Sequence, residues 1–231
     1  MMNHKLSVTP TKKELLWGSI YMVLEMFVLS SLLYLVNALL HNPLPDSILN
    51  CIYFAVNFLF VALIFRKFLL KTFSQPISKI PRILTSSILA YVLYWVGLTI
   101  VGIMIFNVDP EYNNVNDTNI ADLVYENFWP MAFCTVGLVP ITEELLFRGV
   151  LFAGIYNRRP ILAVLVSTVV FCIIHVMGYI GLYPPQTLLL CLLQYVPAGL
   201  ALCFAYIRAD SILAPVLMHM FINATGILAM R

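Results

Sequence analysis

Three charged residues lie within six positions of one another in an otherwise apolar part of the sequence. The stretch PITEELLFRG contains Glu143, Glu144 and Arg148. A charged side chain at the centre of a membrane helix costs about 2.5–3.5 kcal/mol on insertion scales. Glu144 and Arg148 are four residues apart, the spacing at which two side chains form an ion pair on a helix. Glu143 points about 100° away from Glu144 around the helix axis and has no partner nearby in the sequence. We interpret Glu143 as a carboxylate that is free for chemistry; a structural salt bridge beside a water-accessible glutamate is the alternative.

Two histidines lie inside apolar segments, each with a second residue four positions away. FCIIH ends at His175, and HMFIN begins with His219 and ends with Asn223. His219 and Asn223 share one face of a helix, so both side chains can reach the same place. An ionisable residue in a membrane span indicates function by default. Hydrogen bonding between helices is the alternative for both histidines.

Together these residues have the chemistry for general-base hydrolysis. A carboxylate with an imidazole can deprotonate water, and imidazole and amide N–H groups can donate to a developing oxyanion. The sequence contains no G-x-S-x-G or H-E-x-x-H motif, and no serine or cysteine in a nucleophile motif accompanies the acids and histidines. The set therefore indicates amide hydrolysis by activated water inside a membrane cavity.

The ordered trio EELLFR, FCIIH and HMFIN resembles the E-E-x-x-x-R, F-x-x-x-H and H-x-x-x-N/B motifs of the CPBP family. This family comprises CAAX proteases and bacteriocin-processing enzymes, is also called Abi, and includes the eukaryotic prenyl-protein endopeptidase Rce1. The resemblance covers roughly the last ninety residues. It implies an intramembrane glutamic endopeptidase in which Glu143 and His175 activate the water, while His219 and Asn223 form the oxyanion site.

The resemblance gives Glu144 and Arg148 the role of bracing the site, which agrees with their ion-pair spacing. We expect no cofactor. Because members of the family were once regarded as metalloproteases, a zinc ion held by Glu143, His175 and His219 is the alternative. Catalytic zinc sites normally have three protein ligands and one open position.

The composition is that of an integral membrane protein. Hydrophobic residues make up 61% of the 231 residues and charged residues 10%, whereas soluble domains are about a quarter charged. A helix needs about 20 apolar residues to cross a bilayer. This criterion predicts an all-α, polytopic transmembrane helix bundle with about seven spans, and we expect the first to be retained rather than cleaved as a signal peptide. The predicted spans are 15–40, 48–65, 83–106, 122–141 (helical through 157), 161–182, 187–207 and 211–230.

Basic residues fall in alternate loops, which predicts the orientation of the chain. They occur in the N-terminal tail, after the second and fourth spans and before the seventh, whereas the intervening loops lack them. The excess of Lys and Arg marks cytosolic loops, so we expect a cytosolic N-terminus. We also expect a single integral membrane domain, 1–231, with a motif-bearing core at about 122–230.

Glu25 and the five cysteines remain outside the motifs. The cysteines all lie in apolar runs without CxxC spacing, which argues against a disulfide framework and a cysteine metal site. Glu25 lies in the first span without a local partner, and its role stays open between structure and function.

These observations favour an intramembrane endopeptidase, multi-pass in the cell membrane, and a bacterial plasma membrane is the expected location. Its partners would be the lipid bilayer and a membrane-associated peptide or protein substrate, without nucleic acid. A non-catalytic bacteriocin immunity or scaffold protein of the same family is the alternative. A proton-coupled transporter is a third hypothesis, disfavoured by the odd number of spans and the absence of an internal repeat.

Overall fold

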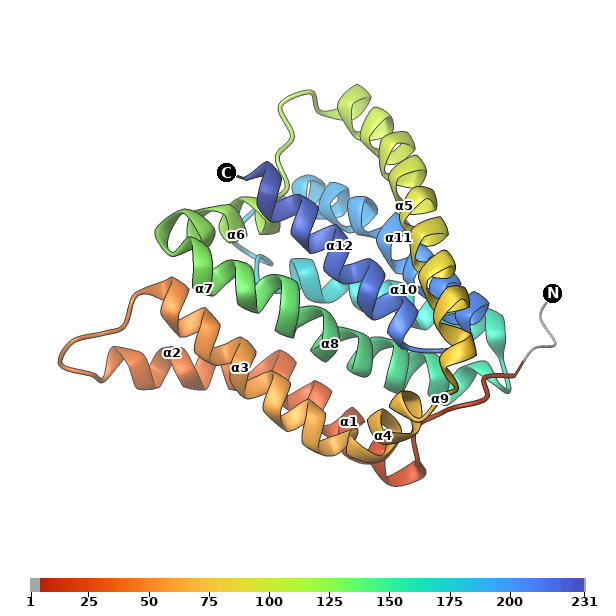
Figure 1. The fold of residues 1–231 in the computed structure, drawn as a ribbon. Coiled ribbons are helices and arrows are strands. Elements are labelled where there is room, and N and C mark those ends of the chain that lie inside the picture. The colour runs from red at the N-terminus through yellow and green to blue at the C-terminus, as the bar shows by residue number, and fades with distance from the viewer. Residues whose placement is uncertain (1–4, 231) are drawn as a thin grey trace.

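The computed structural model describes residues 5–230, and helices account for nearly all of them (Figure 1). Within the described residues no strand forms, so the predicted all-α membrane bundle is confirmed. The α-helices are α1 (Lys12–Leu24), α2 (Ser30–Ala38), α3 (Asp46–Ile64), α4 (Arg66–Phe73), α5 (Ile80–Val108), α6 (Val115–Glu126), α7 (Phe128–Phe133), α8 (Val139–Glu144), α9 (Ala153–Tyr156), α10 (Pro160–Met177), α11 (Pro185–Ala209) and α12 (Leu213–Ala229). Four further turns are η1 (Glu25–Leu29), η2 (Ile77–Lys79), η3 (Cys134–Leu138) and η4 (Leu145–Phe152), of which η2 is a 3₁₀ turn and the others are π-helical.

Several helices are long and apolar enough to cross a membrane. Among the described residues there are five, and they are Lys12–Ala38, Asp46–Ile64, Ile77–Val108, Pro160–Met177 and Pro185–Ala209. The apolar helix α12 is shorter, and the continuously helical run from 128 to 156 is divided by π turns. The count of seven spans and the cytosolic N-terminus therefore stay predictions, while the multi-pass character of the chain is clear.

Large apolar side chains cover the outer faces of these helices. Trp17 on α1, Val96 on α5 and Leu165 on α10 are each more than half exposed. Soluble monomers rarely expose extended apolar surfaces of this kind. The outer faces are therefore suited to contact with lipid.

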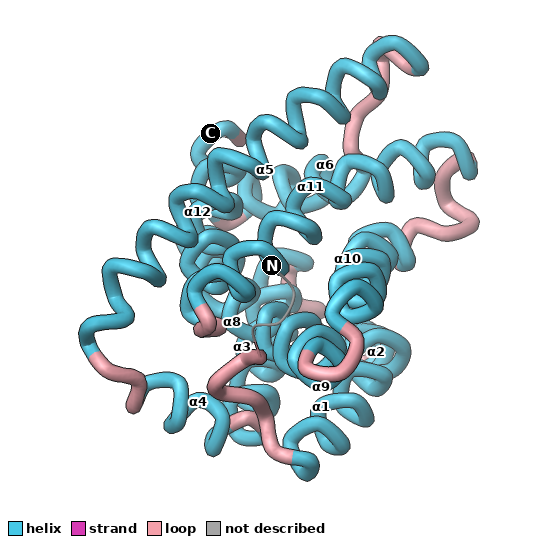
Figure 2. Tube along the Cα trace, turned by 90° about the vertical axis from the view of Figure 1, so that its right-hand side faces the viewer, coloured by secondary structure: helices cyan, strands magenta, loops and turns pink. Residues whose placement is uncertain are grey.

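The helical run from 128 to 156 lies at the centre of the bundle (Figures 1 and 2). Helix α3 packs against η3 and α8 on one side, and α12 packs against the same two segments on another. Helix α10 packs against η4, while α5 packs against α11 and α12. The central run carries EELLFR, and two of its charged side chains, Glu144 and Arg148, are fully buried inside the bundle.

A π turn lets this central run continue through Pro140. Proline has no N–H and disfavours helix at the residue before it, and on that basis a new helix is expected to begin with Thr142 as its N-cap. That expectation is wrong. Thr142 lies inside α8, and its hydroxyl donates to the carbonyl of Leu138 at 3.0 Å. The wider turn η3 accommodates the missing donor without ending the helix, as π turns do within α-helices.

Asp210 joins three distant parts of the chain at the turn between α11 and α12. It has a positive φ of 52°, a conformation that Asp tolerates better than most residues. Its carboxylate accepts hydrogen bonds from the backbone N–H of Ser7 at 2.7 Å and from Nζ of Lys79 at 2.9 Å. Burial tends to raise the pKa of Asp210, but these bonds outweigh it and hold the pKa below its ordinary value. The five cysteines are all free, as expected.

Candidate active site

Glu144 and Arg148 form the predicted ion pair, and both side chains are fully buried. Arg148 Nη1 lies 3.0 Å from Glu144 Oε1. The guanidinium also donates from Nη2 to the carbonyl of Gly199 at 3.2 Å and lies 4.6 Å from the centre of the Phe171 ring. The pair thus ties the central helix to α10 and α11. Neither side chain lines the cavity, so the geometry fits a bracing role.

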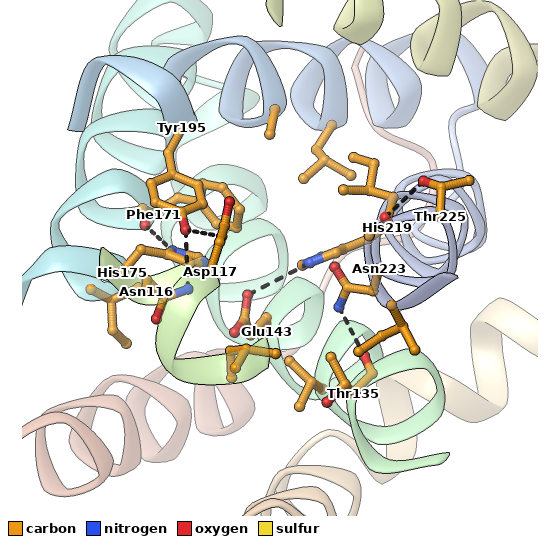
Figure 3. A pocket seen from close by; sticks show the side chains of 18 of the residues that line it. Asn116, Asp117, Thr135, Glu143, Phe171, His175, Tyr195, His219, Asn223 and Thr225 are labelled. Carbon is orange, nitrogen blue, oxygen red and sulfur yellow. Dashed lines mark hydrogen bonds and ion pairs between the residues drawn. The ribbon is translucent and has the colours of Figure 1, made fainter. Parts of the chain in front are cut away.

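His219 lies between the two glutamates. Its Nδ1 is 2.9 Å from Glu144 Oε1. Its Nε2 is 3.9 Å from Glu143 Oε2, the contact that Figure 3 shows. An ionised carboxylate can only accept a hydrogen bond, so Nδ1 of His219 carries a proton in this contact. Nε2 then faces Glu143 and can donate a hydrogen bond only when the ring is doubly protonated.

Glu143 differs from Glu144 in exposure and in partners, as the sequence predicted. Its side chain is 22% exposed, whereas that of Glu144 is wholly buried. Among the described residues its Oε2 has no hydrogen-bond partner. Glu143 points into a cavity of about 450 Å³ that His175, His219 and Asn223 also line (Figure 3). Four of the six predicted residues therefore meet in one cavity.

His175 is held in one tautomer by its own helix. Its Nδ1 is 2.8 Å from the carbonyl of Phe171, and a carbonyl only accepts, so the proton sits on Nδ1. The lone pair of Nε2 is left for another partner. The ring packs against those of Phe171 and Tyr195, with centroid distances of 4.6 and 4.3 Å. In residues 5–230 no hydrogen bond joins His175 to Glu143, although both line the cavity.

Asn223 is positioned by the π turn before Pro140. In this turn the Val139 N–H donates to the carbonyl of Cys134, five residues earlier. The next bond of the pattern would join Pro140 to the carbonyl of Thr135, but proline has no N–H. Asn223 Nδ2 supplies the missing donor to Thr135 at 2.8 Å (Figure 3). The amide keeps a second N–H for a ligand in the cavity.

A polar group that the motifs do not include lies beside His175. The Tyr195 hydroxyl donates to Asp117 Oδ1 at 2.8 Å and accepts from Asn116 Nδ2 at 3.0 Å (Figure 3). Burial raises the pKa of Asp117. In the sequence, Asn116 and Asp117 belong to a polar loop segment far from any motif. The one feature in the sequence that could have indicated a role for them is a group of acidic and amide residues between two apolar spans. The same composition is typical of a solvated loop.

Glu25 also lines this cavity, on the side formed by the N-terminal helices. It begins the π turn η1 and accepts a hydrogen bond from the Tyr53 hydroxyl of α3 at 3.0 Å. The partner comes from another helix, which explains why none is found near Glu25 in the sequence. The second carboxylate oxygen, Oε2, is buried without a hydrogen bond.

The residues of the zinc alternative do not form a ligand set. In the described part of the chain, no three His, Cys, Asp or Glu side chains are grouped so that they could hold a metal ion. Nδ1 of His175 and Nδ1 of His219 are already engaged by the carbonyl of Phe171 and by Glu144. Independence from a metal stays a prediction, to be tested by analysis of the purified protein.

One comparison with known proteins finds a match. Residues 125–225 match the family model described as type II CAAX prenyl endopeptidase, Rce1-like. No curated protein and no solved structure matches the chain. The matched region contains all three motifs and all six predicted site residues. Residues 125–225 are therefore similar to the Rce1-like endopeptidases, in agreement with the family resemblance that the motifs indicate.

Proposed function

We propose that this protein is an intramembrane endopeptidase that hydrolyses a peptide bond of a membrane-associated peptide or protein. The observation that carries the proposal is the shared cavity. Glu143 and His175 line it together with His219 and Asn223, and among residues 5–230 neither Glu143 Oε2 nor His175 Nε2 makes a hydrogen bond. The match to a family of CAAX endopeptidases supports the same function.

In the proposed reaction, a water molecule in the cavity lies between Glu143 and His175. Glu143 takes a proton from this water, whose oxygen attacks the carbonyl carbon of the scissile bond, while Nε2 of His175 accepts a hydrogen bond and orients it. A tetrahedral oxyanion forms. Glu143 then returns the proton to the leaving nitrogen as the C–N bond breaks. General acid–base catalysis of this kind typically contributes about 10²–10⁴-fold to the rate.

The oxyanion would receive hydrogen bonds from Asn223 and His219. The second N–H of the Asn223 amide is available, because the first is held by Thr135. His219 can donate from Nε2 when its ring is doubly protonated, and Glu144 at Nδ1 would compensate that charge. The buried Glu144–Arg148 pair fixes the Nδ1 side of the ring. It therefore acts through His219 and not on the substrate.

The surroundings of the cavity support a membrane-associated substrate. The cavity lies between helices whose outer faces are apolar, which suits a substrate that approaches from the membrane or its surface. A peptide with a membrane-embedded or lipid-modified segment satisfies this requirement. Processing of a bacteriocin or another peptide precursor at a bacterial plasma membrane belongs to this class, and a non-catalytic immunity or scaffold role remains the competing function.

The test uses purified wild-type protein in proteoliposomes containing membrane peptides extracted from the source cells. New peptide termini are identified by mass spectrometry. We expect termini that appear with the wild type and are absent with Glu143→Gln and with His175→Ala, both of which should insert and fold normally. Glu111→Gln, an exposed acid outside the cavity, is the matched control. The same termini with Glu143→Gln, or none with the wild type, would favour the non-catalytic role.

Asn223→Ala and His219→Ala test the oxyanion site separately. We expect each to lower kcat about 10²–10³-fold with a smaller effect on KM, because an oxyanion donor acts in the transition state. The measurement is steady-state hydrolysis of a peptide identified in the preceding experiment. Unchanged kcat in both variants would remove this role from the mechanism.

A further inference from the structure

Glu25 is the least satisfied carboxylate of the cavity outside the proposed catalytic group. Its residue exposure is 8%, and it lines the cavity with Oε2 buried and without a partner. Oε1 is held by the Tyr53 hydroxyl, so the carboxylate has a fixed position. A buried carboxylate oxygen without a hydrogen bond costs free energy, and more so when the group is charged. A ligand that satisfies Oε2 would remove that cost.

The charges around the cavity favour a cation as that ligand. Its lining contains three acids, Glu25, Asp117 and Glu143, and among the described residues no Lys or Arg lines it. Arg148 lies outside it, fully buried and already paired with Glu144. Glu25 and Glu143 line the same cavity. A neutral donor would satisfy one oxygen but would leave this excess of negative charge unchanged.

The π turn η1 and helix α3 build this position. Glu25 is the first residue of η1, and π turns inside α-helices often occur at functional sites. Four residues beyond Tyr53 on α3, Asn57 accepts a hydrogen bond from Tyr21 at 2.6 Å. Two tyrosine hydroxyls thus join the first membrane helix to α3, one at Glu25 itself and one at Tyr21, four residues before it. These residues all lie outside 125–225, so the family match does not account for them.

We propose that Glu25 is a specificity subsite that binds a lysine or arginine side chain of the substrate, next to the catalytic group. This inference rests on the proposed function, because it assumes that the bound peptide is the substrate. Binding of a basic side chain at Glu25 does not itself require hydrolysis. The ammonium or guanidinium would donate to Oε2 while Tyr53 continues to donate to Oε1. A peptide whose basic residue lies near its membrane segment fits both the apolar surroundings and the acidic cavity.

The test measures binding to purified protein in detergent micelles by microscale thermophoresis. The probes are three acetylated, amidated pentapeptides that differ at the central position: Leu-Leu-Lys-Leu-Leu, the same peptide with norleucine, and the same peptide with glutamate. Hydrogen bonds to charged groups are stronger than those between neutral groups, so we expect the wild type to bind the lysine peptide about tenfold or more tightly than the norleucine peptide. The glutamate peptide should bind the weakest.

Glu25→Gln keeps the shape of the side chain and should bind the lysine and norleucine peptides equally. Glu25→Lys should favour the glutamate peptide. Glu111→Gln makes the same change of net charge as Glu25→Gln but lies outside the cavity, so it should behave as the wild type. Equal binding of lysine and norleucine peptides by the wild type, or no binding of either, would overturn the subsite. So would a lysine preference that survives in Glu25→Gln.

The outcome is separable from that of the proposed function. A lysine preference that depends on Glu25 in a protein without hydrolytic activity would keep the binding site and reject the protease. Hydrolysis that depends on Glu143, without any effect of Glu25 on lysine preference, would keep the protease and reject the subsite.

Discussion

Substitution of Arg148 by alanine tests how the buried ion pair holds the site. The change removes the donors to Glu144 Oε1 at 3.0 Å and to the carbonyl of Gly199 at 3.2 Å. Breaking a buried pair by removing one partner costs about 3–5 kcal/mol. Glu144 keeps the hydrogen bond from His219 at 2.9 Å, so we expect the lower end of that range, about 3 kcal/mol. For a chain of this size that corresponds to a fall in Tm of about 6–12 °C.

The measurement is thermal unfolding of the purified protein in detergent, monitored as the fraction of protein that remains monodisperse after heating. Arg148→Lys keeps the charge but not the planar fork, so its Tm should lie between those of Arg148→Ala and the wild type. Lys79→Ala breaks a partly exposed pair with Asp210 and should cost less. Glu144→Gln combined with Arg148→Met leaves no unpaired charge and should regain much of the lost Tm without regaining activity. An Arg148→Ala protein that unfolds within 2 °C of the wild type (about 1 kcal/mol or less) and has lost activity would refute the bracing role and indicate direct contact with substrate.

Three further predictions concern packing, pH and metal. Gly199→Ala should destabilise the protein by about 1–3 kcal/mol in the same thermal assay, because the added Cβ would lie 2.7 Å from Thr168 Cγ2. Gly102→Ala is the control: the added Cβ would meet open space, so its Tm should be no lower than that of the wild type. The pKa of Asp210 is lowered in the folded protein, so its stabilising contribution is present above its ordinary pKa of 3.8 and is lost as the pH falls through the lower folded value. Asp210→Asn should therefore lower the Tm at pH 7, and its Tm should fall less than that of the wild type on acidification to pH 3. Equal falls in Tm for the two proteins would contradict the argument. Purified protein should contain far less than one zinc per chain by elemental analysis and should keep its activity in the presence of a chelator. If the protein instead held one zinc per chain, and His175→Ala lost both the zinc and the activity, His175 would be a zinc ligand.

The sequence indicated the fold class and the motif residues because both depend on local patterns. Apolar runs of membrane-spanning length follow from the thickness of the bilayer. The pairing of Glu144 with Arg148 follows from the four-residue helical spacing, which the π turn η4 does not prevent. The same geometry distinguishes Glu143 from Glu144, because neighbouring residues on a helix point in different directions. The structure agrees, with Glu143 facing the cavity and Glu144 buried.

The local rule failed at Pro140, where the missing N–H suggested a new helix beginning at Thr142. A π turn depends on whether the surrounding packing and hydrogen bonds satisfy the displaced backbone groups. Here the donor for the carbonyl of Thr135 comes from Asn223, 88 residues further along the chain. A rule that considers only neighbouring residues cannot anticipate that donor.

What the sequence by itself determined, then, is a helical membrane bundle carrying three ordered motifs. The tertiary structure decided which side chains meet. The contact of His219 with Glu144 spans 75 residues, that of Tyr195 with Asp117 spans 78, and that of Tyr53 with Glu25 spans 28. The physical reason is that periodicity fixes which face of a helix a residue occupies, whereas the partner of that face depends on how the helices pack.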